Sequence, residues 1–161
     1  MKVYRLFKTI HALISNNKAF KLVTWFNNQL NEGTIHTTPA VYIQFAGDLK
    51  PETLHFQLQQ APITLRVFLV NKLLSKTDGS IDTNILQTTE ELAESIYYSL
   101  QGFESMVYNG DILINSLQRT NYAIDMDNPG WVIITQDFEC MIYQPEQVKD
   151  TVKVTGVNIT V

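Results

Sequence analysis

Two carboxylates near the end of the chain, Asp137 and Glu139, have the spacing of residues that project from one face of a β-strand. Paired carboxylates carry out acid–base catalysis where a water-poor cleft displaces their pKa values. On an exposed strand face, such carboxylates are solvated. The sequence therefore leaves two hypotheses open for this pair, a small enzymatic or ligand-binding site and a solvated strand face.

The histidines and the cysteine do not have the spacing of a reactive site. His11, His36 and His55 have no partner at the i+3 or i+4 spacing that brings metal ligands together, so the sequence predicts no metal site. Cys140 falls on the apolar face of a predicted strand, where a small hydrophobic residue is expected. A nucleophilic thiol needs an exposed position that stabilises the thiolate. We therefore predict no catalytic residue and no cofactor.

Two further motifs are incomplete. The seven glycines are scattered and form neither a GxGxxG nor a GxxxxGK phosphate loop. The segment Asp125-Met126-Asp127-Asn128 resembles half of a calcium loop, but it lacks the glycine and the distant glutamate of an EF-hand. Because Asp, Asn, Pro and Gly are the usual turn residues, we interpret residues 125–130 as the tip of a hairpin.

The composition is that of one ordinary globular domain. The chain has 161 residues, of which 45% are hydrophobic and 17% are charged. The chain has no uncharged apolar run of about 18 residues, so the sequence predicts no membrane helix. Charged residues interrupt the apolar residues of the N-terminal segment, which is not typical of a signal peptide. The single cysteine excludes an intrachain disulfide and fits a reducing cytosol. The net charge of −4 offers no general attraction for nucleic-acid phosphates.

Apolar residues at helical spacing predict two amphipathic helices. The first begins near Val3 and ends at Ser15-Asn16-Asn17. On its outer face lie Lys2, Arg5 and Lys8, either as a solvent-facing stripe or as a contact for an acidic partner. The second helix precedes Gly102, which is its predicted terminator. Its predicted N-cap is Asp82, and a capping box of Thr88 and Glu91 is the alternative.

Strand periodicity occupies most of the remaining chain. Residues 20–26 favour a short strand, and alternation predicts further strands around residues 41–45, 54–58 and 63–70. A long hairpin follows, outward over residues 112–125 and back over residues 131–143. The order of helix, strands, helix and hairpin, without βαβ repetition, predicts the α+β class. The expected architecture is an antiparallel or mixed β-sheet with two helices packed on one face and a long C-terminal β-hairpin.

Arg119 lies in the outgoing strand of the hairpin among polar neighbours. Arginine is suited to bidentate pairs with carboxylates, so its expected partners are Asp125, Asp127 or the acidic residues of a neighbouring subunit. The hairpin strands are also longer than the usual 5–6 residues or so. Long arms are useful where subunits meet, and a twisted hairpin packed within its own domain is the alternative. We therefore assign Arg119, Asp125 and Asp127 to a protein interface.

The last residues form a separate unit. We expect one α+β domain over residues 1–145 and a β-prone C-terminal tail or arm over residues 146–161. The apolar residues of the tail alternate with polar ones, and the alternation shifts at Gly156, as a β-bulge would produce. Either the tail pairs with the sheet of its own chain or it adds a strand to a neighbouring subunit. The tail residues assigned to this interface are Val152, Val154, Val157 and Ile159.

A family resemblance rests on the order of these elements and on short motifs around them. The motifs are Thr38-Pro39-Ala40-Val41-Tyr42-Ile43-Gln44-Phe45, a glutamine-flanked strand over residues 59–70, Ser116-Leu117-Gln118-Arg119, and Gln136-Asp137-Phe138-Glu139-Cys140. Together they resemble the tail-terminator and tail-completion proteins of long-tailed bacteriophages and related prophages. The resemblance covers roughly residues 3–143, which is the extent of one domain.

The resemblance implies a structural protein of the virion, made in the bacterial cytoplasm and placed at the head–tail junction. The family forms a hexameric ring that caps the tail tube and docks to the head connector. The implied partners are copies of itself, the tail-tube protein and a head-completion or connector protein. DNA passes through the lumen without specific binding, and no membrane, catalytic residue or cofactor is involved. The alternatives are a head-completion or connector adaptor, and a small enzymatic or ligand-binding domain that uses Asp137 and Glu139.

Overall fold

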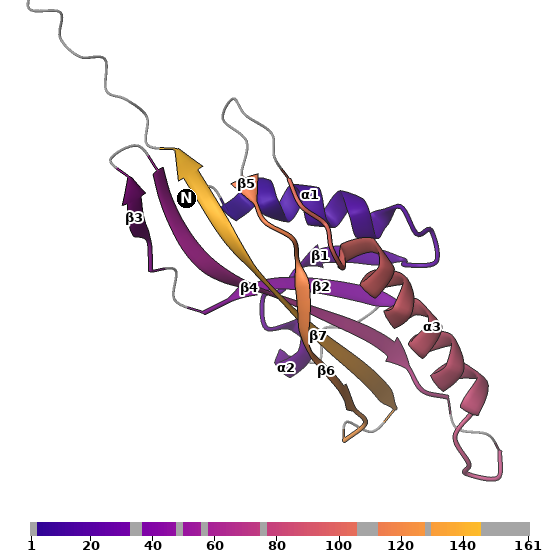
Figure 1. The fold of residues 1–161 in the computed structure, drawn as a ribbon. Coiled ribbons are helices and arrows are strands. Elements are labelled where there is room, and N and C mark those ends of the chain that lie inside the picture. The colour runs from indigo at the N-terminus through magenta and orange to yellow at the C-terminus, as the bar shows by residue number, and fades with distance from the viewer. Residues whose placement is uncertain are drawn as a thin grey trace, which may run out of the picture.

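The computed structural model describes residues 3–32, 37–47, 50–55, 58–74, 77–105, 113–127 and 130–145. The elements are α1 (Val3–Ser15), β1 (Leu22–Trp25), α2 (Gln29–Glu32), β2 (Ala40–Ala46), β3 (Glu52–His55), β4 (Leu58–Lys72), α3 (Thr83–Leu100), β5 (Leu113–Ile114), β6 (Gln118–Asp125) and β7 (Trp131–Pro145). The long helices α1 and α3 lie on one face of a single sheet (Figure 1). This confirms the predicted α+β architecture. His36 and the tail residues Val152, Val154, Val157 and Ile159 lie outside the described residues.

The sheet is mixed, in the order β1-β2-β4-β7-β5, with β3 also paired to β4 and β6 also paired to β7. Strand β1 runs parallel to β2, and the other pairs are antiparallel. The central pair, β4 and β7, stays in register along its whole length, from Leu58 opposite Pro145 to Lys72 opposite Trp131. Consequently β1 lies at one edge of the sheet, and β5 and β6 lie at the other.

Pro62 lies inside β4, where the strand changes its outer neighbour. Residues before it pair with β3, and residues from Thr64 onward pair with β2. Because proline has no backbone N–H to donate, it fits a position where one side of the strand has no partner. Strand β4 therefore continues through Pro62 as one strand.

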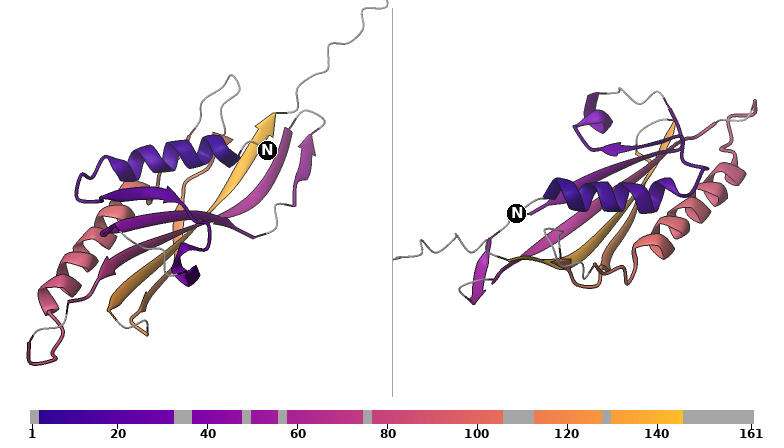
Figure 2. Two further views of the ribbon diagram at one scale, coloured as in Figure 1. Left: turned by 180° about the vertical axis from the view of Figure 1, so that it is seen from behind. Right: turned by 90° about the horizontal axis from the view of Figure 1, so that it is seen from above.

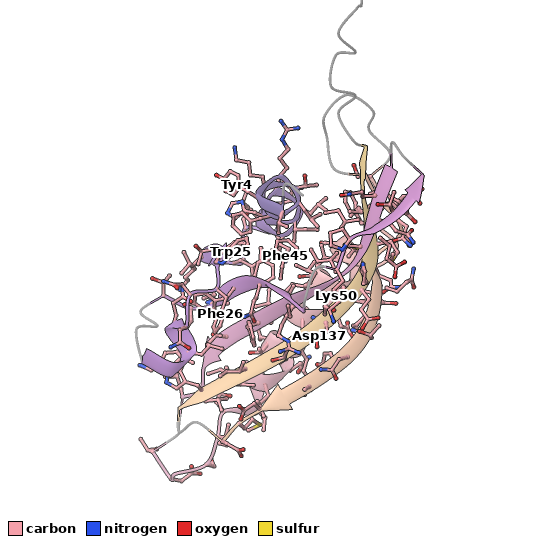
Figure 3. All side chains as sticks on the ribbon, turned by 90° about the vertical axis from the view of Figure 1, so that its left-hand side faces the viewer. Tyr4, Trp25, Phe26, Phe45, Lys50 and Asp137 are labelled. Atoms are coloured by element: carbon pink, nitrogen blue, oxygen red, sulfur yellow. The ribbon has the colours of Figure 1, made fainter. Side chains whose placement is uncertain are left out.

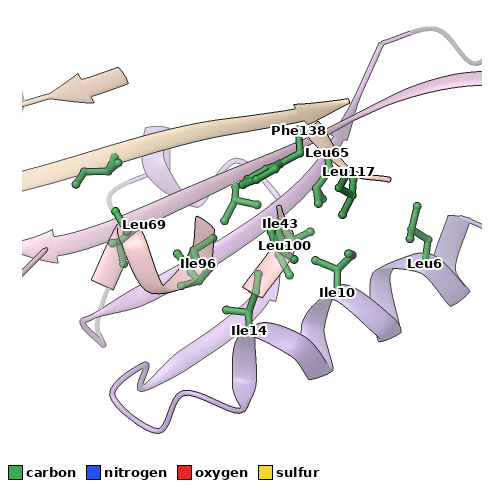
Figure 4. Close-up of a cluster of buried hydrophobic side chains, with 14 of the residues drawn as sticks. Leu6, Ile10, Ile14, Ile43, Leu65, Leu69, Ile96, Leu100, Leu117 and Phe138 are labelled. Carbon is green, nitrogen blue, oxygen red and sulfur yellow. The ribbon is translucent and has the colours of Figure 1, made fainter. Parts of the chain in front are cut away.

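The main core fills the space between the sheet and the two long helices (Figure 4). Helix α1 contributes Leu6, Ile10 and Ile14, which recur at helical spacing and are almost fully buried. Each buried aliphatic side chain of this kind stabilises the fold by about 1.5–3 kcal/mol. Helix α3 begins at the predicted N-cap, since the Asp82 carboxylate accepts a hydrogen bond from the Asn84 backbone N–H. After its end, Gly102 has a φ of +76°, which glycine adopts without strain.

The outgoing arm of the hairpin is not continuous, and in this respect the prediction was wrong. It is interrupted between β5 and β6, where Leu117 is fully buried in the main core and its backbone N–H donates to the Phe103 carbonyl oxygen. Asn115 restores the link to β7, because its side-chain oxygen accepts a hydrogen bond from the Met141 N–H at 2.6 Å. Burial of Leu117 therefore outweighs continuous strand pairing at this point.

The sheet face opposite α1 and α3 is partly covered. A second cluster there contains Tyr42, Val70 and Ile133, and Leu30 from the short helix α2 packs against it. The alternation of Thr135, Asp137 and Glu139 with apolar residues predicts that this face of the return strand is solvated. The expectation was wrong at this end of the sheet, because α2 and the preceding segment fold over it (Figure 2).

Candidate functional site

Strand β6 forms an open edge of the sheet. All eight of its residues are exposed, and its strand partner within the described parts of the chain is β7 alone. The register shifts between Arg119 and Asn121, so Thr120 is the extra residue of a bulge. An edge strand presents backbone N–H and C=O groups on which another strand can pair. The arrangement therefore offers a surface for another chain.

Arg119 is held at the start of this edge by aromatic and amide groups. Its guanidinium carbon lies 4.1 Å from the ring centroid of Tyr97 and 5.4 Å from that of Tyr122. Its Nη1 atom donates to Gln136 Oε1 at 3.3 Å, and its backbone N–H donates to Gln101 Oε1 at 2.9 Å. These contacts fix Arg119 against α3, with its side chain still exposed.

The acidic residues at the hairpin tip have a different role from the one expected within the chain. The Asp125 carboxylate accepts a hydrogen bond from the Asp127 backbone N–H at 2.8 Å, which closes the turn. The structure thus brings Asp125 and Asp127 together but associates Arg119 with Tyr97, Tyr122 and Gln136. The assignment of Arg119, Asp125 and Asp127 to a protein interface stays a prediction.

Helix α3 places acidic side chains beside the β6 edge. Glu90, Glu94 and Tyr97 recur at i, i+4 and i+7, so they share one side of the helix. Partial burial raises the pKa of the Tyr122 hydroxyl, and the negative charges of Glu90 and Glu94 raise it further. Because Arg119 lies between Tyr97 and Tyr122, the helix and the edge strand form one mixed aromatic and charged surface.

Gln136 is a buried polar residue that was not predicted from the sequence. It is 1% exposed, on the apolar face of β7 between Ile134 and Phe138. Its Nε2 atom donates to the Ala93 carbonyl oxygen at 2.8 Å, and its Oε1 atom accepts from Arg119. The available signal was a glutamine in the middle of an otherwise apolar alternation. Gln136 therefore ties β7 both to α3 and to the arginine at the open edge.

Asp137 is ion-paired, which corrects the expectation of a solvated strand face. Its residue exposure is 6%, and its two oxygens accept from Nε and Nη2 of Arg66, each at 2.8 Å. Asn121 adds a third, longer contact of 3.5 Å. The pair forms because Arg66 and Asp137 stand directly opposite each other on β4 and β7. The alternation of β7 alone could not reveal this partner.

The ion pair determines the charge of Asp137. Hydrogen bonding from Arg66 lowers the pKa of the Asp137 carboxyl and raises the pKa of the Arg66 guanidinium. Glu139, two residues further along the strand, is exposed. A carboxylate that accepts two hydrogen bonds from an arginine, and whose pKa is therefore lowered, is poorly suited to accept and release protons at neutral pH. The two carboxylates therefore do not form the acid–base pair that one hypothesis required.

Cys140 and His11, two further residues considered for chemistry, are both in contact with other parts of the fold. Cys140 is buried as predicted, and burial raises the pKa of its thiol to about 12. The His11 ring nitrogen Nε2 lies 3.0 Å from the Val23 carbonyl oxygen. Over the described ranges, no three His, Cys, Asp or Glu residues come close enough to hold a metal ion. None of the described helices is both long and apolar enough to cross a membrane.

These features define a class of protein, a small α+β domain with two helices on one face of a mixed sheet and an exposed edge. No protein-family model and no curated protein sequence matches the chain. Solved structures do match it. One matching chain belongs to a structure described as "Virion of native gene transfer agent (GTA) particle", with a TM-score of 0.51 and 10% sequence identity. The match covers 84% of this chain and 84% of that chain. At this identity, the comparison shows a shared fold.

Proposed function

We propose that this protein is a structural component of a virion. The observation that carries the proposal is the fold shared over 84% of both chains with a chain of a gene transfer agent virion. Within this class we propose a tail terminator, a ring of identical copies that caps the tail tube at the head–tail junction and docks to the head connector. This finer role rests on the order of the sequence elements and motifs described above.

The exposed edge supports an assembly role. A subunit of a closed ring needs two different complementary surfaces, one for each neighbour. The β6 edge, with Arg119 fixed between Tyr97 and Tyr122, supplies a candidate for one of them. Tyrosine and arginine are enriched among the residues that contribute most to protein interfaces. The net charge of −4 suits a lumen through which DNA slides without being held.

We propose that the tail over residues 146–161 also contributes to assembly. Its β-prone residues Val152, Val154, Val157 and Ile159 suit addition of a strand to the sheet edge of a neighbouring copy. The competing arrangement is pairing within the same subunit.

The hypothesis of an enzyme has less support. It required Asp137 and Glu139 to act together in a water-poor site, whereas Asp137 is paired with Arg66 and Glu139 is exposed. Replacing both carboxylates by their amides should therefore abolish no ligand binding, and its effect should be confined to stability and assembly.

The test of the proposed function is capping of a growing tail tube. Purified protein is sized by light scattering, alone and with the tail-tube protein of the same particle, and then added to polymerising tubes. We expect multimers of the 18.4 kDa chain, tubes whose growth stops, and rings at tube ends in negative-stain images. A protein that stays monomeric in both conditions and leaves tube growth unchanged contradicts the proposal. Binding to the portal complex, without binding to tubes, would identify the head-completion adaptor instead.

A further inference from the structure

Charge is segregated along this chain. The charged residues in the segment 1–31 are all Lys or Arg, and those in the segment 77–118 are all Asp or Glu. The first stretch contains α1 and β1, and the second contains α3. The sheet order places β1 at one edge and β6, against which α3 is held through Arg119, at the other. The fold therefore converts a charge pattern in the sequence into two oppositely charged edges.

The basic edge is defined by Lys8, Lys18 and Lys21, all of which are exposed. Two exposed aromatic side chains, Tyr4 of α1 and Trp25 of β1, lie on the same side of the molecule (Figure 3). Tyr4 is 63% exposed, and Lys8 Nζ lies 5.1 Å from the centre of its ring. Trp25, on the edge strand β1, is 39% exposed and packs against Phe7 and Phe45. Tyrosine and tryptophan are enriched at protein interfaces, and the lysines beside them give this edge a positive charge that an acidic surface can complement.

The acidic edge is defined by Glu90, Glu94 and the exposed residues of β6. Both glutamates are exposed on the side of α3 that faces Tyr122. Tyr122 and Ile124 are each more than 40% exposed, and Tyr98 of α3 is 76% exposed. Arg119 is the basic residue on this edge, and its guanidinium lies over the Tyr97 ring. This edge thus combines net negative charge with apolar contact area.

We infer that the basic edge of one copy of this chain docks against the acidic edge of the next. The occupant is a second copy because the two surfaces on one chain complement each other in charge and both include aromatic groups. Contact between two identical edges would bring like charges together, so the association is head to tail. Repetition of such a contact produces a ring when the rotation closes. The inference rests on the proposed ring and names the surfaces that form it.

The test uses reciprocal charge reversals on the full chain. The basic-edge variant carries Lys8→Glu and Lys21→Glu, and the acidic-edge variant carries Glu90→Lys and Glu94→Lys. These side chains are exposed, so the fold should be retained, which circular dichroism checks. The controls reverse charges away from both edges, in one variant with Lys50→Glu and Lys72→Glu and in another with Glu52→Lys.

Each edge variant alone should assemble at least about tenfold more weakly than the wild type, because its two edges then carry the same sign of charge. An equimolar mixture of the two variants should recover assembly, since alternating copies restore opposite charges at every contact. The controls should assemble as the wild type does. Masses are measured by light scattering at low and high salt, with and without tube protein, and salt should weaken the wild-type assembly.

The outcomes separate this inference from the proposed function. Assembly and tube capping that persist in both edge variants would overturn the inference and leave the terminator role standing. A mixture that stays dissociated would also overturn it. A wild-type chain that remains monomeric in every condition would overturn both.

Discussion

Replacement of Asp137 by asparagine should destabilise the domain through loss of its pair with Arg66. The carboxylate accepts two hydrogen bonds of 2.8 Å from the guanidinium, and the Asp137 side chain is 9% exposed. Hydrogen bonds to charged groups contribute about 1.5–3 kcal/mol. Because the Arg66 side chain is 39% exposed, solvent screens the pair. We therefore expect a loss of about 1–2 kcal/mol in the free energy of unfolding at pH 7.

The effect of Asp137→Asn should depend on pH in a defined direction. Arg66 lowers the folded-state pKa of Asp137 below its ordinary value of 3.8. The stabilisation is therefore present above the unfolded pKa and is lost as the pH falls through the folded pKa. The difference in the free energy of unfolding between wild type and variant should have its full size at pH 7 and should become smaller below about pH 4.

Urea unfolding, followed by tryptophan fluorescence at pH 7 and at pH 3.5, measures both effects. The matched control is Glu139→Gln, an exposed carboxylate on the same strand, which should change stability by no more than about 0.5 kcal/mol. A double-mutant cycle with Arg66→Gln should give a coupling energy of about 1–2 kcal/mol. Equal stability of wild type and Asp137→Asn at pH 7, with no coupling to Arg66, would refute the reasoning.

Three further outcomes follow from the described contacts. Gln136→Ala should cost about 1–3 kcal/mol in urea unfolding, because it removes the link to the Ala93 carbonyl and leaves a cavity; wild-type stability would contradict that role. Cys140 should resist alkylation by iodoacetamide at pH 7.5 in the native protein and react once urea unfolds it, since burial raises the pKa of its thiol to about 12; rapid native labelling, read by mass spectrometry, would show that the thiol is accessible. Removal of residues 146–161 should leave the melting temperature within a few degrees and weaken assembly; a truncated chain that fails to fold would place the tail inside the domain.

Local patterns predicted the two long helices and most of the strands correctly, but not the short helix α2. The strand predicted over residues 54–58 was also wrong in its bounds, because β3 ends at His55 and β4 begins at Leu58. In α3, the buried positions Thr89, Leu92, Ile96 and Leu100 follow the helical period, and Asp82 caps the helix as its residue type suggests. These features depend on residues within a few positions of one another. The buried faces of α1 and β7 were predictable for the same reason, because periodicity reports directly which face is apolar.

The charged and polar contacts depended on distant residues. Arg66 and Asp137 are separated by 71 positions and meet only because β4 and β7 pair in a particular register. Gln136 reaches the Ala93 carbonyl across the interface between sheet and helix. Arg119 was expected near carboxylates, but the bulge at Thr120 and the nearby α3 place it against tyrosines. The sequence offers no single pattern from which these partners follow.

The position of β7 has a consequence for synthesis of the protein on the ribosome. This strand pairs with β4 on one side and with β5 and β6 on the other, yet translation produces it after all other described elements. A nascent chain that lacks residues 131–145 has no strand on which β6 can dock. Pairing between segments so distant in sequence is also slow relative to local folding. The β6 edge is therefore completed only when translation of the domain is complete, so an unfinished chain cannot present this edge to another chain.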